Sequence, residues 1–94
     1  MITIIATLKV KEGKMNEAVE VLKEVVPKVR NTEPGCLAYI PHTVRGEENT
    51  IIFYEKYQDK EALKLHSGNL PKTMEKLLPL IEPGSEIKTC YEIV

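Results

Sequence analysis

Apolar and polar residues alternate along the first ten positions of the chain. The apolar side of this alternation comprises Ile2, Ile4, Ala6, Leu8 and Val10. A period of two predicts a β-strand with one strongly apolar face. After a turn, apolar residues recur at three- and four-residue spacing, which predicts an amphipathic helix from Lys14 to about Arg30. Pro27 lies inside that helix and should kink it or loosen its last turn.

A turn and two strands are predicted next. Glu33-Pro34-Gly35 is typical of a type II turn, in which the proline presets φ and the glycine supplies a positive φ. A strand follows over residues 36–44, and a polar hairpin loop over 45–49. The β-branched and aromatic residues of 50–57 then favour a second strand.

Residues 59–81 predict two helices rather than one. Asp59 can cap a short helix that runs to Ser67, because its carboxylate can accept from the free N–H groups of the first turn. Gly68 would end this helix in a left-handed conformation. Asn69 would cap the next helix, whose buried stripe comprises Leu70, Met74, Leu77, Leu78 and Ile81. A last strand is predicted over residues 86–94, after a second Glu-Pro-Gly at 82–84.

The order strand, helix, Glu-Pro-Gly, strand therefore occurs twice. This doubling predicts a single domain over residues 1–94 with the ferredoxin-like βαββαβ arrangement. Such an α+β fold has a four-stranded antiparallel sheet with both helices on one face.

The other face of that sheet would be left uncovered. It should carry one of two apolar sets, either Ile5, Leu37, Tyr39, Ile51 and Phe53 or Ala38, Ile40, Ile52 and Tyr54. Either set is larger than the apolar patches that monomers usually expose. We therefore expect a homodimer in which two uncovered sheet faces pack against each other.

Composition narrows the class of protein. A net charge of −1 gives no electrostatic drive toward nucleic acid or anionic lipid. No apolar run approaches the ~18 residues of a membrane span, and no signal for export is evident. Cys36 and Cys90 are too few for a disulfide framework, so we expect buried thiols in a reducing cytoplasm.

His66 is the first candidate for chemistry. It shares a helix face with Ala62 and Leu63, which should carry its imidazole toward the sheet. An imidazole can serve as a general base near neutral pH. The alternative is a structural histidine bonded to a backbone carbonyl.

Tyr54 and Tyr57 lie on opposite faces of their strand, so at most one could hold a substrate beside His66; each could instead be a packing residue.

His42 is a further candidate for substrate binding, although an edge-exposed histidine would explain it equally. Neither His42 nor His66 has an acidic or thiolate companion at ligand spacing, so no metal site is predicted. RNA-binding domains with the same topology need exposed aromatics and a basic surround. Here the third strand carries the aromatic Phe53 but no Lys-Gly-Phe-type ribonucleoprotein motif, which argues against an RNA-binding domain.

Several stretches of the chain resemble the antibiotic biosynthesis monooxygenase (ABM) domain family. These are residues 33–39 (EPGCLAY), 54–66 (YEKYQDKEALKLH), the opening residues 2–13 and the closing Tyr91-Glu92. The resemblance implies a dimeric α+β barrel with a small cavity between sheet and helices in each subunit. It implies three chemistries: cofactor-independent oxygenation of quinols and related phenols, haem degradation, and isomerisation of a phosphorylated autoinducer product.

Departures from the family pattern narrow these choices. Ala6 and Thr7 stand where haem-degrading members carry asparagine, which argues against haem cleavage, and Tyr57 stands where many members carry tryptophan. The leading hypothesis is a cofactor-independent monooxygenase with His66 as base in an apolar cavity. One alternative is a non-catalytic dimeric binding or stress-response module. Another is an isomerase of a small phosphorylated dione, for which Lys72 would be the nearest phosphate-binding cation.

Overall fold

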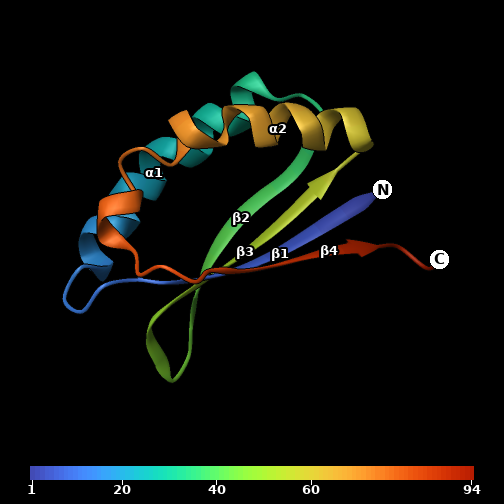
Figure 1. The fold of residues 1–94 in the computed structure, drawn as a ribbon. Helices are drawn as coiled ribbons and strands as arrows, with labels where there is room; N and C mark the ends of the chain where they lie inside the picture. Colours follow the sequence, from blue (N-terminus) through green and yellow to red (C-terminus); the bar gives the residue numbers. More distant parts are fainter.

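The structure is a computed structural model that describes all of residues 1–94. Its elements are β1 (Ile2–Lys9), α1 (Met15–Thr32), β2 (Cys36–Val44), β3 (Glu47–Tyr57), α2 (Lys60–Thr73), the short 3-10 helix η1 (Leu78–Leu80) and β4 (Glu86–Tyr91). The strands form one antiparallel sheet in the order β2-β3-β1-β4. Both helices lie on the same side of this sheet (Figure 1). The predicted ferredoxin-like α+β fold is therefore confirmed.

The alternation of β1 decides which face of the sheet the helices cover. Ile2, Ile4, Ala6 and Leu8 are all buried, and the residues between them are less so. In the register of β1 with β3, Ala6 lies opposite Phe53 and Leu8 lies opposite Ile51. Residues that face each other in a ladder point to the same side, so these inward positions form one apolar surface beneath the helices.

The first helix runs further than the sequence predicts, because α1 continues through Pro27 to Thr32. The prediction of two later helices is wrong: α2 is one helix that passes through Gly68 and Pro71 and ends at Thr73. Gly68 does not adopt a positive φ. Leu63 and Met74, on either side of it, both pack against the core, and this packing outweighs the cost of about 1 kcal/mol that a helical glycine carries.

The turn between α1 and β2 differs from the predicted type II geometry, because Gly35 has no positive φ. The turn is closed by a hydrogen bond of 2.9 Å from Cys36 N to Glu33 O. Gly35 is required for a different reason. A Cβ at this position would lie only 2.5 Å from the Cβ of Ala62, so the missing side chain lets α2 approach the turn closely.

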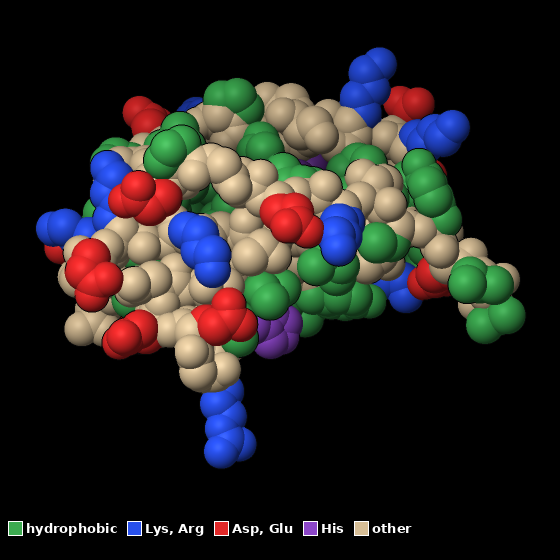
Figure 2. Space-filling model, turned by 60° about the horizontal axis from the view of Figure 1, so that its bottom comes forward, with side chains coloured by type: hydrophobic (Ala, Val, Ile, Leu, Met, Phe, Trp, Pro, Cys, Tyr) green, Lys and Arg blue, Asp and Glu red, His purple; other side chains and the backbone are tan.

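The uncovered face of the sheet is apolar over its centre and carries all four residues of the second predicted set, together with Ile5, which was predicted in the other set. Ile5 lies opposite Tyr54 in the ladder, so it belongs with the outward residues of the neighbouring strands. The outward apolar set is Ile5, Ala38, Ile40, Ile52 and Tyr54. Figure 2 views this side of the molecule obliquely and shows hydrophobic side chains lying among charged ones. By contrast Tyr39, Ile51 and Phe53 are buried under the helices.

Two smaller expectations concern the hairpin and the cysteines. The hairpin loop is shorter than predicted, since β3 already begins at Glu47. Cys36 and Cys90 are free thiols, but each is partly exposed rather than buried. None of the helices has the length and apolar composition that a membrane crossing needs.

Candidate functional site

A cavity of about 500 Å³ lies between the sheet and α2. Eleven of its 16 lining residues are hydrophobic, and none is a lysine or arginine. The sheet contributes Ile4, Ala6, Leu8, Phe53 and Ile87, and α2 with the segment after it contributes Leu63, Leu70, Pro71, Met74, Leu78 and Ile81. The polar lining residues are His66, Glu55, Tyr39, Ser67 and Ser85. The cavity is therefore an apolar space with a few polar groups.

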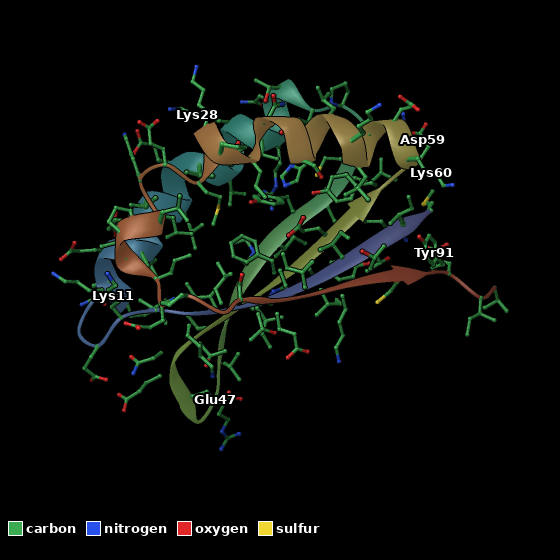
Figure 3. All side chains as sticks on the ribbon, in the orientation of Figure 1. Lys11, Lys28, Glu47, Asp59, Lys60 and Tyr91 are labelled. Atoms are coloured by element: carbon green, nitrogen blue, oxygen red, sulfur yellow. The ribbon has the colours of Figure 1, made fainter.

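The start of α2 determines where the imidazole of His66 lies. The carboxylate of Asp59 accepts from Ala62 N at 2.9 Å and caps the helix, as predicted. Figure 3 shows Asp59 and Lys60 together at this end of the helix. Leu63 and His66 then share the face of α2 that lines the cavity. His66 is only 4% exposed, so the helix buries its imidazole between the layers.

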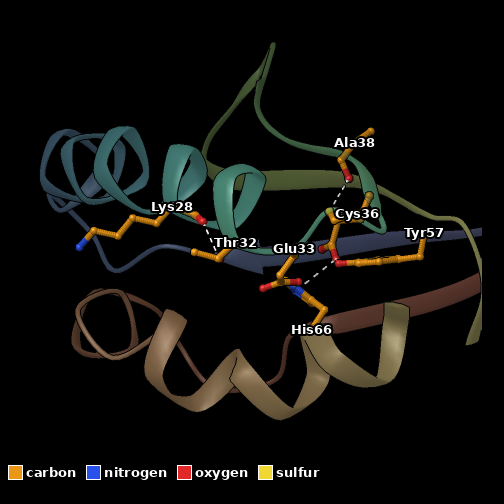
Figure 4. Close-up of polar contacts among 8 residues, drawn as sticks. Lys28, Thr32, Glu33, Cys36, Ala38, Tyr57 and His66 are labelled. Carbon is orange, nitrogen blue, oxygen red and sulfur yellow. Dashed lines mark hydrogen bonds and ion pairs between the residues drawn. The ribbon is translucent and has the colours of Figure 1, made fainter. Parts of the chain in front are cut away.

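Glu33, in the turn after α1, binds the inner nitrogen of His66. Its Oε1 lies 2.8 Å from His66 Nδ1, and both side chains are almost fully buried (Figure 4). An ionised carboxylate can only accept hydrogen bonds. With Glu33 as the acceptor of this bond, Nδ1 is the donor, and Nε2 is the ring nitrogen without a hydrogen-bond partner in the chain.

Glu55, on β3, is the second buried carboxyl group at the site. Tyr57 OH donates to Glu55 Oε1 at 2.6 Å, and the same oxygen lies 3.7 Å from His66 Nε2. Burial raises the pKa of Glu55, while the hydrogen bond from Tyr57 and the proximity of His66 oppose this rise. Burial also raises the pKa of Tyr57, so its phenol keeps the hydrogen that it donates.

Among the polar atoms around the imidazole, His66 Nε2, Glu55 Oε2 and Tyr39 Oη form no hydrogen bond within the chain. No fully buried side-chain nitrogen or oxygen lacks a partner, so these three atoms must retain some accessible surface. Since all three residues line the cavity, we infer that the atoms open onto it. The rings of Tyr39 and Tyr57 pack 5.1 and 5.2 Å from the imidazole and hold it between them.

The structure brings together only part of the predicted set of site residues. His66 lines the cavity, and Tyr57 contacts the imidazole but supports Glu55 from behind rather than lining the cavity. Tyr54 points to the uncovered face of the sheet. His42 is exposed and lines a separate depression of about 360 Å³ between α1 and β2. Neither Tyr54 nor His42 reaches the cavity beside His66.

Sequence reasoning missed Glu33, Glu55 and Tyr39. A signal for Glu55 was present, because it takes an inward position in the alternation of β3, between Phe53 and Tyr57. A carboxyl group at such a position is costly to bury and therefore informative. No local pattern marks Glu33, whose contact with His66 depends on how α2 packs against the turn.

The side chains at the site do not form a recognisable set of metal ligands. No group of three or more histidine, cysteine, aspartate or glutamate side chains is arranged to hold a metal ion. The groups that converge are instead two carboxyl groups, one imidazole and two phenols. Such a set can move a proton and can donate hydrogen bonds to an oxygen atom of a ligand.

Known proteins resemble the chain in sequence. A relative from Bacillus subtilis, named "Putative monooxygenase YcnE", is 36% identical over 67 residues, or 71% of this chain and 70% of the relative. An uncharacterized protein of Synechocystis, sll1783, is 28% identical over 89 residues, or 93% of this chain. The chain spans only 60% of the length of that second relative.

Solved structures resemble the chain in fold. A crystal structure from Caulobacter crescentus, described as a putative antibiotic biosynthesis monooxygenase, superposes with a TM-score of 0.91 at 29% identity. The match covers 99% of this chain and 90% of that one. The antibiotic biosynthesis monooxygenase family itself matches residues 1–70, which include β1, α1, β2, β3 and the part of α2 that carries His66. The chain therefore belongs to the antibiotic biosynthesis monooxygenase family.

Proposed function

We propose that this protein is a monooxygenase, and hence an oxidoreductase, that acts on a small uncharged quinol or related electron-rich phenol without a bound cofactor. His66 would be the general base. The observation that carries this proposal is the position of its imidazole: Nδ1 is bound by the buried Glu33, and His66 lines an apolar cavity of about 500 Å³.

The geometry suits removal of a proton from a phenolic hydroxyl group. Nε2 of His66 would take the proton, and the buried carboxylate of Glu33 would stabilise the imidazolium that forms. The electron-rich anion would then react with O₂. One oxygen atom would join the substrate, the other would leave as water, and the substrate would supply all the electrons. The apolar lining would exclude water from this reaction.

The charges around the cavity favour this chemistry over isomerisation of a phosphorylated dione. A phosphate needs a cation or a cluster of N–H donors to hold it. No lysine or arginine lines the cavity, and Lys72 lies on the exposed surface of α2 outside the lining. An ionised Glu33 beside His66 would also repel a phosphate.

We further propose that the protein is a homodimer through the uncovered face of its sheet. Ile5, Ala38, Ile40, Ile52 and Tyr54 form an apolar surface at the centre of the outward face, on the side of the sheet away from both helices. A second copy offers the same surface, and burial of apolar area contributes about 25 cal/mol per Å². Light scattering coupled to size exclusion at micromolar concentration would give twice the chain mass for a dimer and the chain mass for a monomer.

An oxygen electrode would test the enzymatic proposal. The purified protein should consume O₂ with at least one member of a panel of naphthoquinols and anthranol-type phenols, and one oxygen atom from labelled O₂ should appear in the product. His66→Gln should remove this activity, whereas His42→Gln should not. If no panel member is consumed but several bind, the protein is the non-catalytic binding module instead.

A further inference from the structure

We propose that Glu55 is a second catalytic residue, which in its protonated form donates a hydrogen bond to the substrate oxygen that loses its proton to His66. This inference rests on the proposed function but goes beyond it, because a base alone does not require a second carboxyl group. It assigns the substrate oxygen to a position between β3 and α2, where Glu55 and His66 approach each other.

The distance between the two groups allows one oxygen atom to contact both. Glu55 Oε1 and His66 Nε2 lie 3.7 Å apart, too far for a direct hydrogen bond. Glu55 Oε2 is joined to the same carbon atom as Oε1, so an oxygen atom on the cavity side of this gap can lie about 2.8 Å from both His66 Nε2 and Glu55 Oε2. Glu55 and His66 both line the cavity, so a substrate in the cavity reaches this position.

Tyr57 determines which oxygen of Glu55 faces the substrate as a donor. Its hydroxyl donates to Oε1 at 2.6 Å, so Oε1 acts as an acceptor. A proton on the carboxyl group is then placed on Oε2, which has no partner in the chain and opens onto the cavity. Tyr57 therefore acts as a positioning residue for the acid hydrogen of Glu55.

The charges of the site require a neutral donor at this position. The titratable groups that face Glu55 are Glu33 from the turn, Cys36 and Tyr39 from β2, Tyr57 from β3 itself and His66 from α2. Its partner on β1 is the apolar Ile4. With no lysine or arginine in the lining, a new oxyanion would meet carboxylate repulsion unless Glu55 were protonated. Burial raises the pKa of Glu55 and favours this protonated form.

The proton balance of the step is simple. The O–H bond of the substrate breaks, its proton moves to His66 Nε2, and the electron pair remains on the substrate oxygen. That oxygen then accepts a hydrogen bond from Glu55 Oε2. Glu55 neither gains nor loses a proton, and the imidazolium keeps its contact with Glu33. A carboxylic acid kept neutral by an apolar site is a known type of oxyanion donor.

Paired substitutions at Glu55 distinguish a donor from a base. In Glu55→Gln the amide oxygen can accept from Tyr57, which leaves the NH₂ group to face the cavity as a donor. We expect this variant to keep kcat within about 3-fold of wild type, whereas Glu55→Leu should lose about 100-fold. Equal losses in both variants would overturn the proposal. Glu48→Gln, at an exposed position of the same strand, is the matched control.

The dependence of kcat on pH gives a second test, because a purely structural role of Glu55 would not change it. Wild-type kcat should fall at high pH as Glu55 ionises, and Glu55→Gln should lack this fall because an amide does not ionise. An alkaline limb of the same size in both proteins would contradict the assignment.

A binding measurement tests Glu55 independently of oxygen chemistry. A hydroxynaphthoquinone, coloured and anionic at neutral pH, can be titrated into the protein and followed by its visible absorbance. Wild type and Glu55→Gln should bind it with similar Kd, and Glu55→Leu should bind at least 10-fold more weakly. Equal binding by all three proteins would overturn the proposal even if quinol turnover were observed. The expected pattern would support it even if no quinol were oxygenated.

Discussion

The two faces of one strand, β3, differ in what surrounds similar side chains. Its inward positions carry Phe53, Glu55 and Tyr57 under the helices, and its outward positions carry Tyr54 and Lys56 on the uncovered face. Both faces thus offer a phenol and a charged group. Only the inward face adjoins the cavity beneath α2, so only there can a side chain of β3 contact a ligand held between the sheet and that helix.

The neighbouring residues Glu55 and Lys56 show how the two faces of the strand affect the ionisation of carboxyl groups. Burial raises the pKa of the inward Glu55 and favours its neutral form. The outward Lys56 instead bonds Glu92 at 2.6 Å, and this contact lowers the pKa of Glu92 and favours its charged form. The same strand therefore holds a carboxyl group with a raised pKa on one side and an ion pair on the other. Enclosure, more than residue type, decides which face can carry chemistry.

The largest effect should come from substituting the two histidines, which lie in these two kinds of environment. His66→Gln should lower kcat/KM for a turned-over quinol by at least about 100-fold, because it removes the base. His42→Gln should change it by less than about 2-fold, since His42 is exposed and lies outside the cavity. Steady-state oxygen uptake measures both. A similar loss of kcat/KM in the two variants would contradict the assignment of catalysis to the cavity.

Substitutions of two glycines test how closely α2 packs over the inward face of the sheet. Gly35→Ala should lower the free energy of unfolding by about 1–3 kcal/mol, because the new methyl group would lie 2.5 Å from the Cβ of Ala62. Gly68→Ala should raise it by up to about 1 kcal/mol, since nothing lies near its Cβ position and alanine favours a helix. Urea unfolding followed by circular dichroism measures both changes. A neutral Gly35→Ala would mean that α2 is free to move away from the turn.

A charge on the uncovered face should separate the proposed dimer without unfolding the chain. Ile40, on β2, is 38% exposed in the isolated chain and would be buried between two sheets. We expect Ile40→Lys to raise the dimer Kd by at least about 10-fold, because the interface would bury an unpaired charge. Leu65→Lys, on the exposed side of α2, is the control and should leave the Kd unchanged. Sedimentation equilibrium would detect the difference, and an unchanged Kd for Ile40→Lys would place any interface elsewhere.

The smallest expected effect is a pH-dependent change in stability. The folded pKa of Glu55 is raised, so the folded state favours the protonated carboxyl group. The stability it contributes is present below the unfolded pKa and is lost as pH rises through the folded pKa. Glu55→Gln should therefore have a higher Tm than wild type at pH 7, and this difference should diminish toward pH 4. A variant with a lower Tm at pH 7 would show that the carboxylate is favoured in the fold.

The strand pattern made most of the fold predictable. The period of two in β1 identified its buried face, and Asp59 marked the start of α2 because its capping contact is local. The predictions at Gly68 and Gly35, a helix end and a type II turn, were wrong for the same reason. Local rules assign glycine to chain reversal, whereas Gly68 lies within an unbroken helix and Gly35 permits a close approach of two segments. Tertiary packing decided both positions.

The site was less predictable than the fold. His66 could be found because its helix face is visible in the sequence, and the alternation of β3 could have identified Glu55. The pairing of Glu33 with His66 joins two segments that are distant in the chain, and it depends on the closeness that Gly35 permits. No spacing rule in a single sequence encodes that contact.

The uninterrupted course of α2 connects two parts of the cavity through one continuous helix. His66 lies in its first half, while Leu70 and Met74 line the cavity further along. A ligand too large for the space beside Met74 would tilt the whole rod and withdraw the imidazole from the reacting oxygen. We therefore expect a quinol with a bulky group at the Met74 end of the cavity to be turned over more slowly than a small one of the same chemistry.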